Sequence, residues 1–392
     1  MLQKINNKLQ NIIKPYVTLK KNQKLQTMIN GIEINKYKTI IIFENTFGWE
    51  DIMKQRPQQI ALNFNKNVLF LYHSNKDKYD NKNNYKKIKD NLYMINLDLY
   101  RKYINQYFKN IPNKYLMIYS TNNIKDNIIN NYTDNGFKII YEYIDDIDEE
   151  LSGKRTAKKL LKNYYNIINN DNSYIVCTAT NLYNNVLKDN KDAKVRLITN
   201  GCDYDHFKKR KHNVPDNLKQ IMKSHKPIIG YYGALASWFD YELIKKISNT
   251  NKYEVVLIGI KYDETLDKSD ILKLDNVHYL GKVAYDELPA YSSFFDVSII
   301  PFIINDITLS TSPVKVFEYM ASEKPIVTTD LPECRKYKSI LTSKDHQEFI
   351  NNLDKAIKLI EDEKYMQTLR DDALNNTWES KCNEMISFVN EV

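Results

Sequence analysis

The fold is decided by residues 312–329, which read SPVKVFEYMASEKPIVTT. A Ser-Pro pair ends an extended segment and starts a short helix, and Pro325 then opens a buried strand. The free N–H groups of the first helical turn, together with Lys315, suit a phosphate. Glu318 lies one turn deeper on the same side, where a carboxylate accepts hydrogen bonds from a vicinal diol such as a ribose. The stretch therefore indicates either a nucleotide clamp or an ordinary Lys-x-x-Glu pair on a solvated helix.

The segments on either side of this helix favour the clamp. Residues 295–302, FDVSIIPF, read as a strand that runs into a polar loop ahead of the helix. The order strand, loop, helix, strand puts Lys315 and Glu318 at the carboxyl edge of a parallel sheet. Open α/β folds bind their ligands at this edge.

Residues 312–329 also resemble the donor-binding segment of nucleotide-sugar glycosyltransferases of the GT-B fold. In that family a Pro-x-Lys or Gly-rich loop holds the donor diphosphate, and a helix glutamate holds the ribose. The resemblance implies an α/β protein of two Rossmann-like domains with parallel sheets that face each other across a cleft. The implied donor-binding residues are Tyr232, Gly233, Ser312, Pro313, Val314, Lys315 and Glu318.

Short apolar runs separated by helix-length segments recur along the whole chain, which predicts two parallel sheets in tandem. A length of 392 residues also fits two domains better than one. We expect a basic amphipathic arm at 1–38, an acceptor domain at 39–205, a linker at 206–226, a nucleotide-sugar domain at 227–365, and a C-terminal helix at 366–392. By resemblance, this last helix crosses back onto the first domain.

The start of the second domain carries a further part of the resemblance. Residues 231–240, YYGALASWFD, are similar to the opening of this domain in polysaccharide-assembly glycosyltransferases, including those proposed for teichuronic acid. This places Asp240 at the cleft. Many retaining members have an Arg and a Lys after this strand, and a glutamate eight positions before the ribose glutamate. This chain lacks the pair and has Ser310, so Lys315 becomes the main cation and the anomeric outcome stays open.

A second signature lies near the first strand of the first domain. Residues 47–49, FGW, followed by 55–59, QRPQQ, are similar to a pattern of the same group. The resemblance implies that Gly48, Trp49 and Arg56 line the cleft on the acceptor side. Arg56 then either binds an acidic group or pairs with a nearby carboxylate.

The most acidic run of the chain, residues 141–150, follows a predicted strand and reads YEYIDDIDEE. Asp145 or Asp146 is a candidate general base for an acceptor hydroxyl. Asp146 and Asp148 also form a DxD pattern that binds a divalent ion in GT-A enzymes, or the acids lie on a solvated loop. A metal site leaves Lys315 unexplained, so we favour a base without metal. His73 is either a second candidate base or a structural histidine.

The positive charge of the chain is concentrated at its start. Residues 1–38 contain eight lysines and one acid, Glu33, which amounts to +7 of the formal +8. The apolar residues of 1–15 fall on one helical face, so this segment either binds an anionic membrane surface or packs on the first domain. The arm has neither interleaved aromatic residues nor a binding motif, which disfavours nucleic acid.

The sequence shows neither a long apolar run nor a signal-peptide core, and its four cysteines lack metal or disulfide spacing. We expect a cytoplasmic protein, either free or peripheral on the membrane. The expected activity is metal-independent hexosyl transfer, without cofactor, from a UDP-sugar or related donor to a saccharide, lipid-linked or protein-linked acceptor in cell-surface glycan assembly. The alternatives are a nucleotide-sugar epimerase of the same fold and a non-catalytic scaffold.

Overall fold

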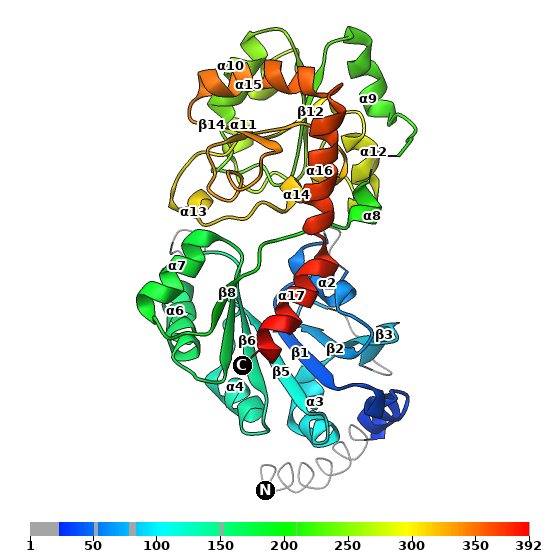
Figure 1. Ribbon diagram of the computed structural model, residues 1–392, viewed down its shortest axis with the longest axis vertical. Helices are drawn as coiled ribbons and strands as arrows, with labels where there is room; N and C mark the ends of the chain where they lie inside the picture. Colours follow the sequence, from blue (N-terminus) through cyan, green and yellow to red (C-terminus); the bar gives the residue numbers. More distant parts are fainter. Residues whose placement is uncertain are drawn as a thin grey trace, which may run out of the picture.

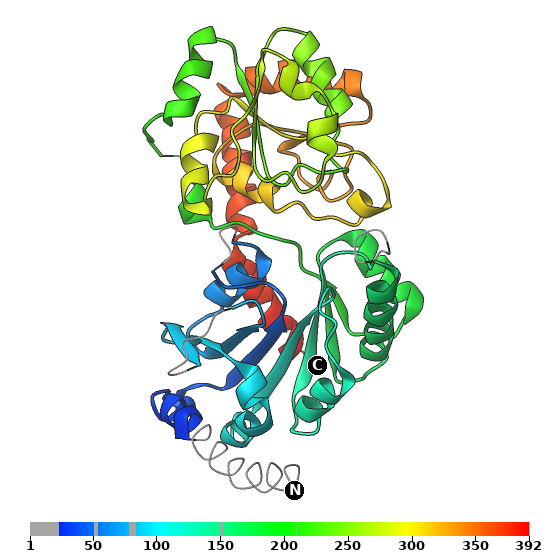
Figure 2. The ribbon, with the colours of Figure 1, turned by 180° about the vertical axis from the view of Figure 1, so that it is seen from behind.

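The computed structural model describes residues 23–50, 54–77, 84–147, 149, 153–208 and 210–391. Two α/β units lie one above the other along the long axis, with helices on both faces of each sheet (Figures 1 and 2). The predicted fold class is therefore confirmed. The predicted membrane-binding segment 1–15 lies outside the described residues.

The first unit is built on an eight-stranded sheet in the order β3-β4-β2-β1-β5-β6-β7-β8. All neighbours are parallel except the edge pair β3 and β4. Its strands are β1 Thr39–Asn45, β2 Val68–Ser74, β3 Tyr85–Lys89, β4 Leu92–Ile95, β5 Asn113–Tyr119, β6 Lys138–Tyr143, β7 Ser173–Cys177 and β8 Val195–Leu197. Its helices are α2 Arg56–Asn63, α3 Leu97–Ile104, α4 Asp126–Thr133, α6 Lys154–Ile168 and α7 Thr180–Asp189.

The second unit is built on a six-stranded, fully parallel sheet in the order β11-β10-β9-β12-β13-β14. Its strands are β9 Ile228–Tyr232, β10 Glu254–Ile258, β11 Val277–Tyr279, β12 Val297–Ile300, β13 Ile326–Thr329 and β14 Ile340–Ser343. Its helices are α9 Asp216–Ile221, α10 Tyr241–Asn249, α11 Thr265–Lys268, α12 Leu288–Ser292, α13 Asp306–Leu309, α14 Val314–Ala321, α15 His346–Leu359 and α16 Glu363–Asn375. The short helix α8 Tyr204–Phe207 joins the units.

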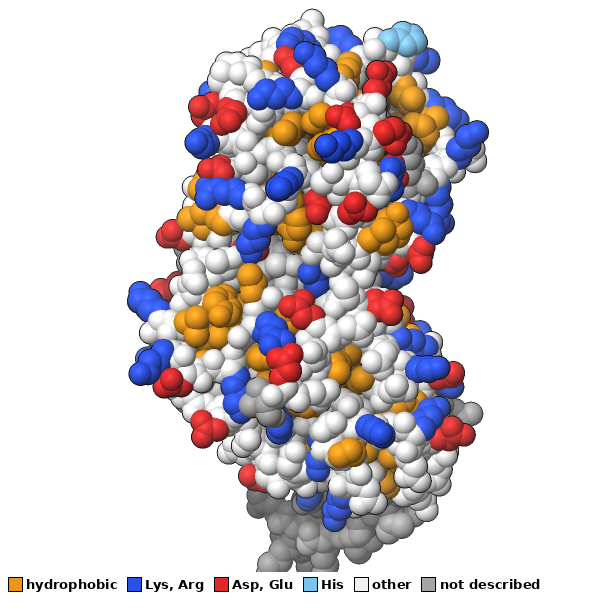
Figure 3. All heavy atoms as spheres, in the orientation of Figure 1, with side chains coloured by type: hydrophobic (Ala, Val, Ile, Leu, Met, Phe, Trp, Pro, Cys, Tyr) orange, Lys and Arg blue, Asp and Glu red, His pale blue; other side chains and the backbone are white. Residues whose placement is uncertain are grey.

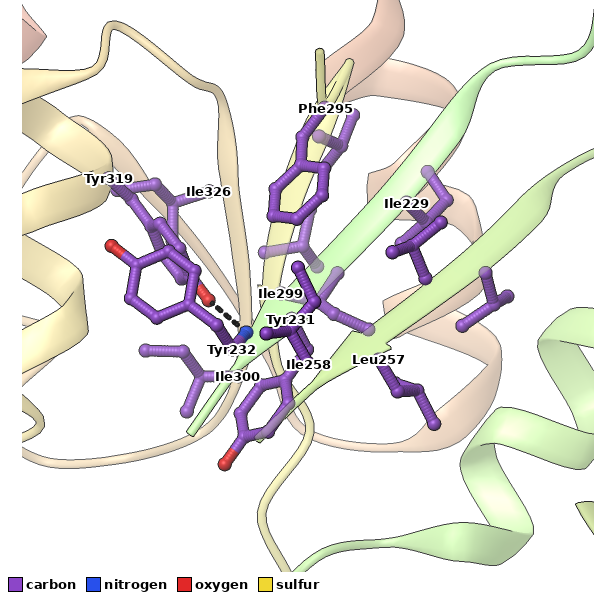
Figure 4. Close-up of a cluster of buried hydrophobic side chains, with 14 of the residues drawn as sticks. Ile229, Tyr231, Tyr232, Leu257, Ile258, Phe295, Ile299, Ile300, Tyr319 and Ile326 are labelled. Carbon is purple, nitrogen blue, oxygen red and sulfur yellow. Dashed lines mark hydrogen bonds between the residues drawn. The ribbon is translucent and has the colours of Figure 1, made fainter. Parts of the chain in front are cut away.

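Most strands of both sheets are buried on both faces, because helices cover both sides. Their apolar side chains form the core of each unit. Figure 4 shows the second core, where the ring of Tyr319 from α14 packs edge-on against Tyr232 of β9 at 4.8 Å. The Tyr319 hydroxyl also accepts a hydrogen bond of 3.0 Å from the Tyr232 backbone N–H. These contacts fix α14 against the central strand.

The chain crosses between the units twice, and the two crossings lie side by side. The backbone N–H of Cys202 donates to Asn376 O at 2.9 Å, and that of Trp378 donates to Cys202 O at 3.1 Å. A Cβ atom on Gly201 would lie 2.7 Å from Asn376 O, so only glycine permits this approach. The final helix α17 Trp378–Asn390 then packs on the core of the first unit.

Two predicted segments have more structure than the sequence suggested. The predicted linker 206–226 contains α9, whose Leu218 and Ile221 belong to the core of the second unit. The described part of the predicted arm includes Leu25 and Met28, which are buried in the core of the first unit. This part of the arm therefore packs on its own domain.

Candidate functional site

The carboxyl edges of the two sheets face each other. Thr180 N–H, after β7, donates to Glu333 Oε1 at 2.7 Å, and Asn200 Nδ2, after β8, donates to Ser312 O at 2.6 Å. The partners Ser312 and Glu333 follow β12 and β13 of the second sheet. Ligands of parallel α/β sheets bind at such edges. The seam between the units, at the narrow waist in Figure 3, is therefore the place for a site.

Lys315 lies in the first turn of α14 on this seam, next to two aromatic rings. Its Nζ is 5.4 Å from the ring centre of Tyr231 and 5.2 Å from that of Phe302. Within the described ranges no carboxylate or hydrogen-bond acceptor pairs with this ammonium. Burial lowers the pKa of Lys315 to about 8, although Glu318 opposes the shift. A crowded cation without an anion at a helix N-terminus is a suitable partner for a phosphate.

Gly233 makes room for the Lys315 side chain at the end of β9. Its φ of +147° is in the region that favours glycine, and a Cβ there would lie 2.8 Å from Lys315 Cε. The neighbouring Gly259 after β10 is equally constrained, because its Cβ would lie 1.8 Å from Gly233 O. Two glycines thus shape the backbone beside the Lys315 ammonium.

Glu318 lies one turn deeper in α14 and is 6% exposed. Burial raises the pKa of its carboxyl to about 7, although the Tyr232 hydroxyl and Lys315 favour the ionised form. Lys315 and Glu318 form no salt bridge with each other. Tyr232 ends β9, and Lys315 and Glu318 lie on α14 beside it; their contacts with a donor stay a prediction.

The remaining predicted donor residues form the start of α14. Pro313 is the N-cap residue, with φ −69°, and Val314 is the first helical residue. Ser312 is buried, and its Oγ has no hydrogen-bond partner in the part of the chain that the structure describes. The free hydroxyl of Ser312 and the free N–H groups of the first helical turn therefore form polar surroundings that suit an anion.

Arg56, predicted at the acceptor side of the cleft, is instead saturated by protein partners. It is 4% exposed and pairs with the fully buried Glu142, with Nε–Oε2 at 2.5 Å and Nη2–Oε1 at 3.2 Å. Its Nη1 donates to Thr199 O at 3.0 Å and to Asn200 Oδ1 at 3.2 Å. Of the two roles considered for Arg56, this geometry favours pairing with a carboxylate. Through Asn200 and Ser312, Arg56 supports the start of α14.

Three further predicted cleft residues also have structural partners. Gly48 is buried, and its carbonyl accepts a hydrogen bond of 2.7 Å from Gln58 Nε2. The half-buried Trp49 packs edge-on against Tyr72 with ring centres 5.1 Å apart. Asp240 caps α10 by accepting from Leu243 N–H at 2.8 Å, and its other oxygen lies 2.8 Å from His346 Nε2. Contacts of these residues with an acceptor stay a prediction.

Asp145 and Asp146 lie just beyond β6 on the same edge of the first sheet. Asp146 accepts from Tyr143 Oη at 3.0 Å and from Ile147 N–H at 2.9 Å, so it is held in place. Asp145 is exposed, yet crowding by the surrounding protein and the charge of Asp146 raise its pKa to about 6. Of the two carboxylates, Asp145 is the one left for a substrate.

Within the described ranges, no group of three or more His, Cys, Asp or Glu side chains is placed to hold a metal ion. Asp148 of the DxD pattern lies outside the described residues. His73 is buried within 4.0 Å of Glu44 Oε2, and burial lowers its pKa. The protein fixes this imidazole within a buried polar cluster.

Polar contacts across the seam hold the two units together, and the sequence did not indicate these contacts. Gln59 Nε2 donates to Tyr285 Oη at 2.9 Å across the seam, and His206 stacks on the Tyr285 ring at 4.7 Å. Asn181 Nδ2 donates to Ser310 Oγ at 2.7 Å. Asn181 lies in the first turn of α7, directly after β7, so the edge rule would have selected it, whereas Ser310 comes after the short helix α13. Gln59 lies inside a helix and offers no such signal.

The sequence is similar to known glycosyltransferases. Residues 226–359 match the family described as Glycosyl transferases group 1. Over 204 residues the chain is 26% identical to a Bacillus subtilis protein, TuaH, described as a proposed teichuronic acid biosynthesis glycosyltransferase. The match spans about half of each chain.

Solved structures resemble nearly the whole chain. Sucrose-phosphate synthase from Thermosynechococcus elongatus is 12% identical with a TM-score of 0.65, over 90% of this chain and 98% of that one. Anabaena HepE in complex with UDP and glucose is 13% identical with a TM-score of 0.60, over 90% and 100%. Among the described helices, none combines the length and the apolar composition that a membrane span requires. The chain therefore has a two-domain fold of the GT-B type, and its residues 226–359 are similar to the glycosyl transferases group 1 family.

Proposed function

We propose that this protein is a glycosyltransferase that moves a sugar from a nucleotide-diphosphate donor to a saccharide, lipid-linked or protein-linked acceptor in cell-surface glycan assembly. The observation that carries the proposal is Lys315, a cation at the N-terminus of α14 that has no anionic partner among the described residues. Such a cation, with free helical N–H groups around it, is suited to a leaving diphosphate. The family match covers this helix.

The proposed roles divide between the two units. Lys315 and the start of α14 stabilise the charge of the departing diphosphate, while Glu318 accepts hydrogen bonds from the ribose hydroxyls. UDP is the favoured nucleotide, because a relative of the same fold was solved with UDP and glucose. Asp145, with a pKa of about 6, is mostly ionised at neutral pH and takes the acceptor proton if the reaction inverts.

The proposal also covers the type of transfer, the biological role and the location of the protein. Transfer of a hexosyl group without metal or cofactor requires a protein cation to stabilise the charge of the diphosphate, and we assign this role to Lys315. A role in cell-surface glycan assembly is supported by the similarity to the proposed teichuronic acid enzyme. A cytoplasmic location, with the 1–15 segment as a membrane contact, belongs to the same proposal.

Titration of UDP and UDP-glucose into the protein by calorimetry tests this function. Lys315→Met, which removes the charge and keeps most of the side-chain volume, should weaken binding by on the order of 100-fold. Lys246→Met is the matched control, because Lys246 is an exposed lysine of the same unit, and it should bind like wild type. If wild type binds none of a panel of nucleotide sugars, the proposal is wrong.

A further inference from the structure

Helix α6, Lys154–Ile168, has a strongly basic exposed face. Its sequence, KRTAKKLLKNYYNII, contains five cations and no acid. All five cationic side chains are exposed: Lys154, Arg155, Lys158, Lys159 and Lys162. Outside residues 1–38 the chain is close to neutral, so this face is a local concentration of positive charge.

Few of these cations have partners in the protein. Among the described residues, only Lys162 forms an ion pair, with Asp126 Oδ2 at 2.7 Å, and both side chains of this pair are largely exposed. Exposed pairs of this kind contribute little to stability. The face therefore keeps most of its positive charge toward solvent.

The stability of α6 does not explain its charges. The positive end of a helix dipole is its N-terminus, and cations in the first turn are unfavourable there. Yet Lys154 and Arg155 occupy this turn, no acid does, and Gly153 gives no side-chain cap. Ala157, Leu160, Tyr164 and Ile167 already pack α6 onto the sheet. Helix stability and packing therefore do not account for these charges.

Two exposed apolar side chains border the cationic face. Leu161 is 36% exposed and Tyr165 is 48% exposed. At 100° per residue both fall within about 60° of Lys154 and Lys158, on the same outward surface. A basic face with an apolar border and an amphipathic tyrosine is the composition of a helix that lies on an anionic bilayer. Nucleic acid would use the cations and stack on Tyr165, whereas an exposed leucine beside them favours a bilayer.

The position of α6 suits such a role. It lies on the outer flank of the first unit beside α7 (Figures 1 and 2). It also begins nine residues after Asp145, at the edge of the sheet that faces the seam. We propose that the exposed face of α6, defined by its five cations with Leu161 and Tyr165, docks the protein on an anionic lipid surface.

Vesicle co-sedimentation tests the proposal without any activity readout, so its outcome is separate from that of the proposed glycosyl transfer. Full-length protein should bind vesicles of phosphatidylcholine with phosphatidylglycerol and not phosphatidylcholine alone, and added salt should release it. The variant Lys154→Glu/Lys158→Glu/Lys159→Glu should lose binding by at least on the order of 100-fold. Residues 1–15 stay unchanged in every variant.

The matched control is Lys211→Glu/Lys223→Glu/Lys246→Glu, which makes the same change in net charge at three exposed lysines of the second unit. It should bind anionic vesicles within a few-fold of wild type. A second α6 variant, Leu161→Asn/Tyr165→Asn, should weaken binding less than the charge variant and without changing its salt dependence. Equal binding of wild type and the α6 charge variant would overturn the proposal. Equal loss in the α6 and control variants, or failure of wild type to bind the anionic vesicles, would also overturn it.

Discussion

Two cations face the seam between the units, and they differ in their partners. Arg56 of the first unit is saturated by Glu142, Thr199 and Asn200. Lys315 of the second unit has two aromatic rings beside it and no anion in the described part of the protein. A buried cation with a full set of partners stabilises the structure, whereas a crowded cation without an anion indicates a ligand site. The resemblance placed both residues in the cleft, and only their partners distinguish them.

The largest expected effect comes from breaking the paired cation. Arg56→Met leaves the Glu142 carboxylate, which is 0% exposed, without its charge partner. Loss of one member of a buried pair costs about 3–5 kcal/mol of the free energy of unfolding. Urea unfolding of wild type and variant measures this loss.

Two variants accompany that measurement. Arg335→Met removes the same side chain from an exposed pair with Asp330, and should cost less than about 1 kcal/mol. Arg56→Met/Glu142→Leu removes both charges and should recover part of the loss. If Arg56→Met is as stable as wild type but fails to bind acceptor, the arginine is a ligand residue and the comparison fails.

The second effect concerns Glu318 and the pH dependence of stability. Because its pKa rises from 4.5 to about 7 on folding, the folded protein binds more protons than the unfolded chain between these values. The contribution of Glu318 is therefore present below pH 4.5 and is lost as the pH rises through 7. The loss is on the order of 3 kcal/mol. Wild type should lose this much stability relative to Glu318→Gln between pH 4.5 and 8, as measured by urea unfolding at each pH. Parallel profiles for the two proteins would rule out a raised pKa.

The third effect concerns the cation without an anionic partner, and it should appear in UDP binding and not in stability. Lys315→Met should leave the free energy of unfolding unchanged or slightly higher, because it removes a desolvated charge without an anionic partner, yet it should lose most of the UDP affinity. In wild type the affinity should fall as the pH rises through about 8, where the free ammonium loses its proton. Lys315→Arg, whose guanidinium stays charged, should keep its affinity above this pH. A pH-independent affinity of wild type from 7 to 9 would contradict the assignment.

The smallest effect tests the link between the two regions. Asn200→Ala leaves Ser312 O without its donor at the start of α14, and should cost about 1–2 kcal/mol and weaken UDP binding a few-fold. Asn181→Ala is the control at the same seam, because Asn181 is exposed and its loss should cost less than about 0.5 kcal/mol. Calorimetric titration and urea unfolding give the two readouts. Equal effects of the two substitutions would show that Asn200 has no special role in supporting α14.

Much of the fold was predictable because buried parallel strands appear in the sequence as short apolar runs. One such apolar run, at residues 138–143, forms β6 in the structure. The edge strand β3 was not predicted, because its sequence, YKKIK, contains three lysines that suit an exposed edge and break the apolar pattern. β4 and β14 have only four residues each and offer little pattern.

The site likewise has one part that the sequence predicts and one part that only the fold reveals. Lys315 and Glu318 are three residues apart on one helix, so their shared face was visible in the sequence. The partners of Arg56 are 86 and 144 residues away, and only the fold brings Glu142 and Asn200 to it. The sequence therefore predicted a cation at position 56 in the cleft region, and its role followed from contacts that no local pattern encodes.

A crystal structure of the protein with UDP tests the central claim most directly. The account predicts that the diphosphate lies at the start of α14, with Lys315 Nζ about 2.7–2.9 Å from a phosphate oxygen, and that Arg56 keeps its bonds to Glu142 and Asn200. A diphosphate bound elsewhere, with Lys315 still against Tyr231 and Phe302, would contradict it.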